Sequence, residues 1–167
     1  MSCFDRRAAL TILAGGLAGC GFRPLYGEGG PADAVLGAVA LQEALSPEDF
    51  AYRERLRRRL DLQSGDASAA WRLTWALDFE SEGVAITSDA DTTRYRLTGT
   101  ARYALSSLRD AAAAPIRGKV SVTGAYDATA SAYATRAAET AERREISTEL
   151  AELTATRLLS SPRRPVS

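Results

Sequence analysis

The sequence contains no histidine, and this absence excludes several kinds of chemistry. Ser–His and Cys–His catalytic pairs need an imidazole base, and zinc sites rely heavily on histidine and cysteine ligands. Only two cysteines are present in the 167 residues, and Cys3 lies in an N-terminal segment with the features of a cleaved signal. We therefore expect no disulfide, no metal site and no cofactor.

The sequence also lacks an excess of charge of either sign. It has 21 basic and 21 acidic residues, and its formal net charge at pH 7 is zero. General nucleic-acid-binding proteins are distinctly basic, so we expect no nucleic-acid partner. Beyond the N-terminus, no apolar run approaches the roughly 20 residues of a transmembrane helix. A hydrophobic content of 46% can supply one core, and the length fits one domain.

The N-terminus has the features of a secretion signal. Arg6 and Arg7 supply positive charge before residues 8–17, which are apolar apart from one threonine and two glycines. This run suits the hydrophobic region of a signal peptide and is too short to span a bilayer. Leu17-Ala18-Gly19-Cys20 follows and matches the lipobox of bacterial lipoproteins. An ordinary signal peptide or a buried helix is the alternative, and Sec and twin-arginine export both remain open.

Acylation of Cys20 would determine where the whole protein resides. Residues 1–19 are predicted to be a lipoprotein signal peptide, and residues 20–33 to be the acylated cysteine and a flexible tether. Each CH₂ buried in lipid contributes about 0.8 kcal/mol, so the several acyl chains of a lipoprotein cysteine give lasting attachment to the bilayer. Gly21 is not the aspartate that retains bacterial lipoproteins at the inner membrane. We therefore expect the outer membrane, on its periplasmic side.

A first helix is predicted from a set of capping residues. Ser46-Pro47-Glu48-Asp49 supplies a serine N-cap, a proline at the first position and an acid at the third. The helix is expected to run to about Leu62. Its apolar face carries Tyr52, Leu56 and Leu60. Its other faces carry Arg53, Arg55, Arg57, Arg58 and Arg59. A solvated face is the simpler interpretation of these arginines, and contact with anionic lipid is the alternative.

Three segments alternate between apolar and polar residues with a period of two, which predicts strands with one buried face. They cover residues 71–80, 94–105 and 116–126. The apolar run 35–41 precedes them and is predicted to be a first strand. Because the three segments are closely connected, with turn residues at 87–91, an antiparallel meander is the economical topology.

A long C-terminal helix is predicted over residues 131–160. Its apolar stripe consists of Ala134, Ala138, Ala141, Ile146, Leu150 and Leu153. The alanines would let the helix approach the sheet closely, and residues 162–167 would form a disordered tail. The prediction is therefore an α+β domain over residues 34–161. It has one approximately four-stranded, largely antiparallel sheet with two helices packed on one face, in the order β-α-β-β-β-α.

The other face of the predicted sheet is left open and is locally basic. It carries Arg72, Arg94, Arg96, Arg102, Arg117 and Lys119 against Asp78 and Glu80. Plain solvation is one explanation, because antiparallel sheets often have one wet face. Contact with a polar wall or with anionic groups is the alternative. The sheet also has at least one free edge with which a partner strand could pair.

Three stretches of the chain point to a known family. Residues 17–27 read Leu-Ala-Gly-Cys-Gly-Phe-Arg-Pro-Leu-Tyr-Gly. Residues 94–105 form the strand after the predicted hairpin, and residues 126–134 join the last strand to the last helix. These stretches resemble the LptE family of lipopolysaccharide-assembly lipoproteins, in its alphaproteobacterial form. The resemblance extends over nearly the whole chain, and the opening Cys-Gly-Phe is its most specific part.

The resemblance implies a function that is not enzymatic. LptE-like proteins plug the outer-membrane β-barrel LptD, help it assemble, and take part in lipopolysaccharide transport to the outer leaflet. The implied partners are an LptD-type barrel, lipopolysaccharide, and the lipid bilayer through Cys20. The resemblance implies lipopolysaccharide contact for Arg136 and Arg94. Residues implied to face the barrel or lipopolysaccharide are Arg96, Arg102, Arg117 and Lys119.

Two other functions remain open from the sequence. The first is an independent lipoprotein that binds a lipid or a small apolar ligand between its sheet and helices. The second is a periplasmic hydrolase, which the absence of histidine and of an isolated pair of acids disfavours. We therefore expect the protein not to be an enzyme.

Overall fold

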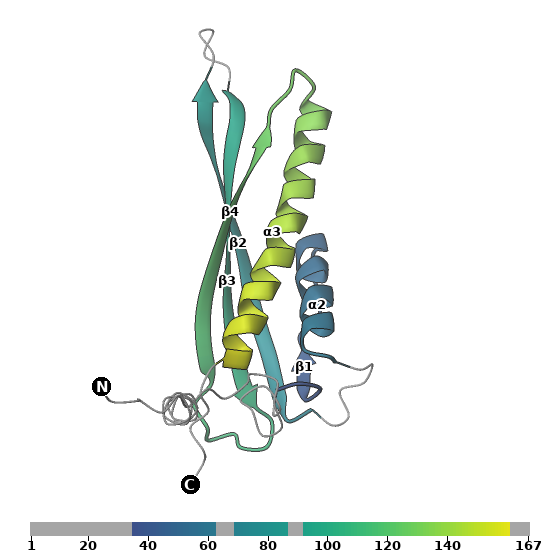
Figure 1. Ribbon diagram of the computed structural model, residues 1–167, viewed down its shortest axis with the longest axis vertical. Helices are drawn as coiled ribbons and strands as arrows, with labels where there is room; N and C mark the ends of the chain where they lie inside the picture. The colour runs from purple at the N-terminus through teal and green to yellow at the C-terminus, as the bar shows by residue number, and fades with distance from the viewer. Residues whose placement is uncertain (1–34, 63–68, 87–91, 161–167) are drawn as a thin grey trace, which may run out of the picture.

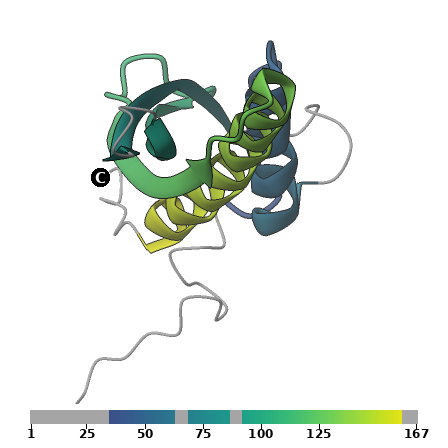
Figure 2. The same ribbon diagram turned by 90° about the horizontal axis from the view of Figure 1, so that it is seen from above.

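A computed structural model describes residues 35–62, 69–86 and 92–160 of the chain. These residues form an elongated body in which both helices lie on the same side of one sheet (Figure 1 and Figure 2). The elements are β1 (Val39–Leu41), α2 (Pro47–Arg59), β2 (Trp71–Ile86), β3 (Thr92–Ser107), β4 (Ile116–Asp127) and α3 (Ala132–Ser160). This order confirms the predicted α+β fold. The predicted signal peptide, Cys20, the tether, the turn at 87–91 and the tail lie outside the described residues.

The sheet has the strand order β1-β2-β3-β4. β1 runs parallel to β2, and the other neighbouring strands are antiparallel, which confirms the predicted meander. The register places Leu77, Ala101 and Val120 side by side on the face that the helices cover. Because side chains alternate along a strand, the three period-two patterns share one apolar face, as the sequence predicted.

β1 is shorter than predicted, because a turn occupies the first part of the apolar run 35–41. Gly37 in this turn has a φ of 70°, a left-handed conformation that favours glycine. Its N–H donates to the carbonyl of Leu60 at 3.0 Å, which joins the turn to the end of α2. Apolar composition did not reveal this turn, so the predicted strand was too long.

Gln42 continues the edge of the sheet after β1 ends. Its backbone N–H donates to the Leu73 carbonyl at 3.2 Å. Its side-chain amide donates to the Trp75 carbonyl at 3.0 Å and accepts from the Trp75 N–H at 3.1 Å. The amide thus takes the place of one further residue of β1. Beyond Trp75, no described strand pairs with this side of β2, so the sheet keeps a free edge there.

α2 begins where the capping residues predict. The Oγ of Ser46 is the N-cap acceptor, receiving the Asp49 N–H at 3.0 Å, and Pro47 is the first helical residue. The helix ends at Arg59 with Leu60 as its C-cap, slightly before the predicted end near Leu62.

The two helices and the sheet enclose one hydrophobic core. Tyr52, Leu56 and Leu60 are fully buried, which confirms the predicted apolar face of α2. The Tyr52 hydroxyl donates to Thr154 Oγ1 of α3 at 2.7 Å, and its ring centroid lies 5.2 Å from that of Trp75 in β2. One tyrosine therefore connects both helices and the sheet.

The buried stripe of α3 differs from the predicted one. Its members are Ile146, Ser147, Leu150, Ala151, Thr154, Ala155, Leu158 and Leu159. Ala134 and Ala141 are exposed, and Leu153 is 43% exposed, so the prediction is wrong for these three residues. The reason is visible in Figure 1, where α2 lies beside the lower part of α3 only. The upper part of α3 has only the sheet to pack against.

Glycines in the strands let α3 approach the sheet closely. A Cβ added to Gly99 of β3 would collide with Cγ2 of Ile146, and one added to Gly124 of β4 would collide with the Glu142 carboxylate. Of the three predicted early alanines, Ala138 alone packs against the core. The helix does approach the sheet closely, as predicted. The small residues that permit this approach are glycines of the sheet, whereas alanines of the helix were predicted.

Candidate functional site

The outer face of the sheet, which the helices leave uncovered, is the first candidate site. The register of β2, β3 and β4 arranges its side chains in rows across the strands. The row formed by Asp78, Thr100 and Ser121 separates a lower half, near the ends of the described chain, from an upper half. The charged residues of the lower half are all basic: Arg72, Arg102, Arg117 and Lys119. Those from the dividing row upward are Asp78, Glu80, Glu82, Asp127, Arg94 and Arg96.

The two arginines of the upper half are ion-paired. Arg94 Nη1 lies 3.5 Å from Asp127 Oδ1, and Arg96 Nη1 lies 3.1 Å from Glu82 Oε2. All four side chains are more than half exposed, so each pair stabilises the fold by at most about 1 kcal/mol. Arg94 and Arg96 therefore lie on the predicted face, but a neighbouring acid offsets part of the charge of each.

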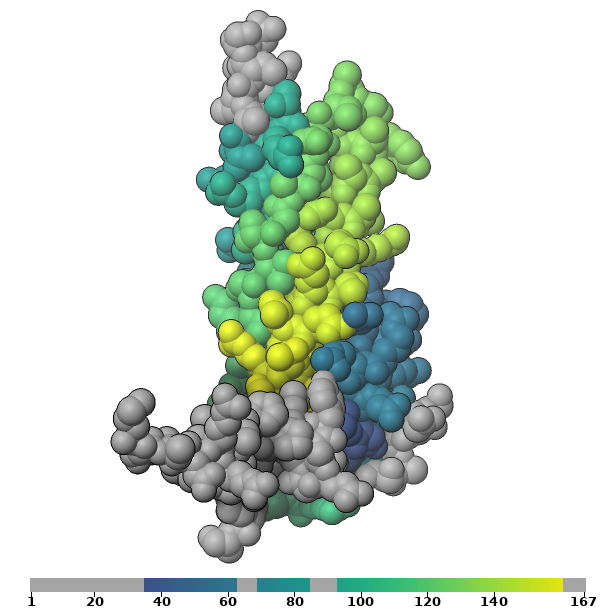
Figure 3. Space-filling model, in the orientation of Figure 1, coloured from purple at the N-terminus to yellow at the C-terminus, as the bar shows by residue number. Residues whose placement is uncertain are grey.

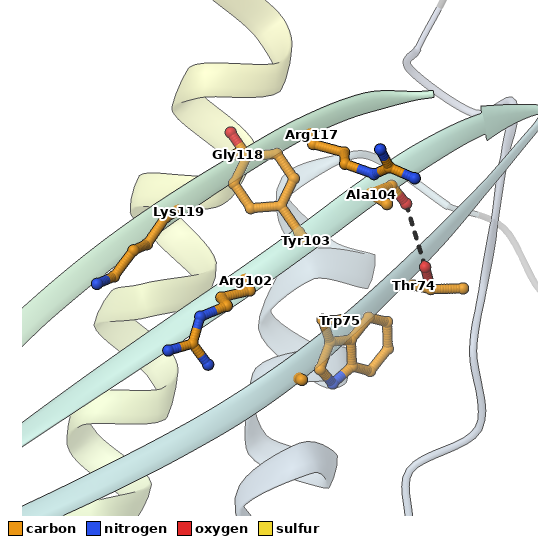
Figure 4. Close-up of a pocket in the computed structure, with 9 residues that line it drawn as sticks. Thr74, Trp75, Arg102, Tyr103, Ala104, Arg117, Gly118 and Lys119 are labelled. Atoms are coloured by element: carbon orange, nitrogen blue, oxygen red, sulfur yellow. Dashed lines mark hydrogen bonds between the residues drawn. The ribbon is translucent and has the colours of Figure 1, made fainter. Parts of the chain in front are cut away.

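The lower half contains a hollow of about 550 Å³, bordered by three of its basic residues. Arg102 and Lys119 are register partners on β3 and β4, and Arg117 lies one row below them, beside Ala104. In Figure 4 the Arg102 and Lys119 side chains extend in the same direction, while Arg117 extends toward Ala104. The sequence predicted that these three residues share a face. It did not predict that they gather around one hollow.

The helix-covered side of the strands supports this hollow. Gly118 has no room for a side chain, because a Cβ there would collide with the Tyr103 hydroxyl. Nη1 of Arg157, in the last turn of α3, donates to the Lys119 carbonyl at 2.8 Å. Burial raises the pKa of Tyr103, and the charge of Arg157 lowers it in part. The end of α3 and the strands below the hollow are thus held together.

Arg136 lies on a second surface, the outward side of the first half of α3. Tyr133, Arg136, Thr140 and Arg144 line a hollow of about 570 Å³ along the helix. Tyr133 is 82% exposed, and Arg136 Nε donates to the Ala132 carbonyl at 3.4 Å. Figure 3 shows that this part of α3 stands on the surface above α2. Residues three or four apart share one side of a helix, so this spacing was the signal that could have added Tyr133 and Arg144 to the prediction.

Two arginines of α2 bind α3, which corrects the prediction of a solvated or lipid-facing arginine face for these two residues, while Arg58 is exposed. Arg55 and Arg59 both pair with Glu152, and Arg59 Nε lies 3.0 Å from its Oε2. Glu152 is 93 residues further along the chain than Arg59, so no local pattern indicated the contact. A third arginine, Arg57, lies 3.9 Å from Glu54 within α2.

The titratable groups with shifted pKa values lie in the core. Burial raises the pKa of Tyr52 well above its ordinary value of 10.0, although the hydrogen bond with Thr154 lowers it in part. Within 35–62, 69–86 and 92–160, no cluster of acids, histidines or cysteines is suited to hold a metal ion. No helix in the described part of the chain is long and apolar enough to cross a membrane. The features that mark the outer face of the sheet as a candidate site are its basic lower half and the hollow there.

Comparison with known families identifies the chain. A family model described as "LptE: Lipopolysaccharide-assembly" matches residues 36–158, which include the six described elements except for the last two residues of α3. This chain belongs to the LptE family. The resemblance found in the sequence is therefore confirmed, and family membership supports a role in lipopolysaccharide assembly. The comparison with curated proteins gave no match.

Solved structures of bacterial lipoproteins share the LptE fold. A lipoprotein of Caulobacter crescentus CB15 has a TM-score of 0.62 at 19% identity, covering 80% of this chain and 96% of its own. Rare lipoprotein B of Shewanella oneidensis has a TM-score of 0.53 at 16% identity, covering 73% and 89%. Lipoprotein B of Nitrosomonas europaea has a TM-score of 0.52 at 9% identity, covering 74% and 81%. At these identities the likeness establishes the fold alone.

Proposed function

We propose that this LptE-family protein is an outer-membrane lipoprotein that plugs an LptD-type β-barrel. In this role it helps the barrel assemble and takes part in lipopolysaccharide transport to the outer leaflet. The observation that carries the proposal is the outer face of the sheet, which is mostly polar, with alanines as its small apolar residues, and is covered by neither helix of the chain. The lumen of a large membrane barrel is polar, so a plug must present polar surface to it.

The length of the domain supports the same role. β2 and β3 have 16 residues each, which at about 3.3 Å per residue corresponds to roughly 50 Å. The apolar band of an outer-membrane barrel is only about 25 Å tall. A domain of this length, inserted along the barrel axis, extends past both rims of that band.

Lipopolysaccharide contact is best supported on the upper part of α3. Arg136 and Arg144 flank Thr140 there, and the exposed ring of Tyr133 lies beside them. Lipopolysaccharide carries phosphates and acidic sugars, which guanidinium groups bind through paired hydrogen bonds. Arg94 is less suited to this role, because it is paired with Asp127.

The alternative of a lipid carrier gains no support from the described core. Buried side chains from both helices and from the sheet fill the space between the two layers. The sequence also contains no histidine for hydrolytic chemistry, and we propose that the protein is not an enzyme.

Enclosure in a barrel can be tested by photo-cross-linking in the native outer membrane. One probe replaces Thr123 on the outer face of the sheet, and the other replaces Thr156, which is exposed on α3. A plug is surrounded by the lumen wall, so both probes should capture the same large barrel protein. Capture by Thr123 alone would indicate docking by one face, and capture of no barrel from either position would refute the proposal.

The anchor can be tested separately. Cys20→Ala should abolish palmitate labelling and leave the chain at its precursor size, because both acylation and cleavage need the thiol. Cys3→Ala is the matched control and should be labelled and processed normally. Labelling that persists in Cys20→Ala would exclude the lipobox without bearing on the barrel.

A further inference from the structure

The basic half of the outer face carries an unfavourable arrangement of like charges. Arg102 and Lys119 are directly opposed on β3 and β4. The Ala128 N–H donates to the Thr93 carbonyl, and bonded pairs alternate along β3 and β4, so Arg102 and Lys119 form a non-hydrogen-bonded pair. In such pairs the Cα atoms are about 4.5 Å apart and the side chains are closest. Like charges directly opposite each other destabilise a sheet, and Arg117 adds a third cation in the next row.

None of these three cations takes part in a described ion pair, and the acid in the adjacent row of the face is Asp78, diagonal to Arg102 on β2. The described ion pairs on this face involve Arg94 and Arg96 of the upper half, while Arg102, Arg117 and Lys119 take part in none. The side chains of all three are exposed at the rim of the same hollow. Three cations that border one hollow and take part in no described ion pair offer a binding site for an anion, and phosphate suits both guanidinium and ammonium groups.

The floor of the hollow differs from its rim. It includes Ala76 and Ala104, which have no polar side-chain atoms, and Gly118, which has no side chain. The hydroxyl of Thr74 donates to the Ala104 carbonyl at 3.4 Å, so part of its hydrogen-bonding capacity is used within the protein. A small apolar floor inside a basic rim fits an anion attached to an apolar body better than a free inorganic ion.

The position of the hollow indicates where such an amphiphile would come from. It lies in the half of the sheet where β1 pairs with the start of β2, at the end of the body where the described chain begins (Figure 1). Val35 is 15 residues after Cys20, and a chain of that length extends at most about 50 Å. An acylated Cys20 would therefore keep this end of the domain within about 50 Å of the bilayer surface.

We propose that the hollow bordered by Arg102, Arg117 and Lys119 binds the phosphate of an anionic glycerophospholipid in the membrane that carries the anchor. The glycerol and the first methylene groups of the lipid then lie on the floor formed by Ala76 and Ala104. The location of this site rests on the proposed anchor at Cys20, but its chemistry does not depend on the barrel. The upper part of α3 is left for lipopolysaccharide, so the domain has two separate anion-binding surfaces.

The test uses a chain that begins at Gly21, which has no acyl group and retains every described residue. Its binding is measured to phosphatidylcholine vesicles with and without about 30 mol % phosphatidylglycerol. An anionic membrane surface attracts each nearby cation of a protein, and each such cation raises the affinity about fivefold. Arg102→Gln/Lys119→Gln should therefore bind the anionic vesicles on the order of 25-fold more weakly. Circular dichroism should show an unchanged fold, because both side chains are exposed.

Arg94→Gln/Arg96→Gln is the matched control. It removes the same number of charges from the same face, but each of these arginines has an acidic partner, so the loss of vesicle binding should be less than about threefold. Equal losses in the two variants would overturn the proposal, since binding would then depend on net charge alone. If Arg102→Gln/Lys119→Gln weakens binding to purified lipopolysaccharide but not to the anionic vesicles, the ligand is not a glycerophospholipid and the proposal is also overturned.

Discussion

Adding a single methyl group at Gly99 tests how the sheet and α3 fit together. In Gly99→Ala, the new Cβ would overlap Cγ2 of Ile146 and come within 3.1 Å of Phe79 Cε1 and 3.2 Å of Leu150 Cδ1. Ile146 is 2% exposed, and its Cγ2 is attached directly to Cβ. A β-branched residue in a helix has one strongly preferred χ1 rotamer, so this methyl group cannot rotate away and α3 must move.

The expected cost follows from two opposing effects. Overpacking of a core costs about 1–3 kcal/mol. Replacing glycine by alanine within a strand recovers about 0.5–1 kcal/mol. Taking the middle of both ranges, we expect Gly99→Ala to lower the free energy of unfolding by about 1–2 kcal/mol. For a domain of this size, that corresponds to a decrease in Tm of roughly 3–8 °C.

A double-mutant cycle identifies the cause of the loss. Ile146→Ala alone should cost about 2–5 kcal/mol through the cavity it leaves. In Gly99→Ala/Ile146→Ala the added methyl group enters that cavity, so the combined loss should fall short of the sum by about 1 kcal/mol or more. Urea unfolding of the four proteins, followed by circular dichroism, measures this coupling.

Gly124→Ala is the control for this cycle. Its Cβ would collide with the end of the Glu142 side chain, which is flexible and can rotate toward solvent, and the nearest Ile146 atom is 3.3 Å away. We expect a loss below about 1 kcal/mol, since no backbone has to move. Additive effects in the cycle, or a larger loss at Gly124 than at Gly99, would refute the claim that Gly99 determines the distance between α3 and the sheet.

Three further predictions concern the edge, the core and the candidate site. Gln42→Glu should destabilise the fold by about 1–3 kcal/mol in urea unfolding at pH 7, because a carboxylate repels the Trp75 carbonyl that the amide now binds, whereas Gln42→Met should cost less. The unfolding free energy should fall as pH rises above about 10, because tyrosine in the unfolded chain ionises there while the buried Tyr52 keeps its proton. Tyr52→Phe should make the unfolding free energy less dependent on pH in this range, and a slope equal to that of the unmodified protein would contradict this prediction. Arg136→Asp should weaken lipopolysaccharide binding at an unchanged Tm, and undiminished binding would remove it from the site.

Local patterns in the sequence were sufficient for much of the fold. The alternation at 71–80, 94–105 and 116–126 depends only on which face of a strand is wet, so it predicted the strands and their shared apolar face. Ser46 and Pro47 predicted the start of α2 because a helix cap is completed within a few residues. The six basic residues named for the outer face were also found there, since strand parity alone assigns the face.

Other features required contacts between residues far apart in the chain. The pairing of Arg55 and Arg59 with Glu152 depends on how two helices lie against each other, and no local spacing encodes that position. The end of β1 depends on the hydrogen bonds between the Gln42 side chain and the Trp75 backbone. The buried stripe of α3 depends on how much of that helix α2 covers. In each case the contact joins residues whose proximity is created by folding itself.

The candidate site divides in the same way. The residue types determined that Arg102, Arg117 and Lys119 share one face of the sheet, because side chains alternate along every strand. Their gathering around one hollow, and the pairing of Arg94 and Arg96 with acids, depend on the register between strands. Register joins residues that are tens of positions apart, so the sequence alone determined the charge of this face, and the tertiary structure decided where on it that charge is left unpaired.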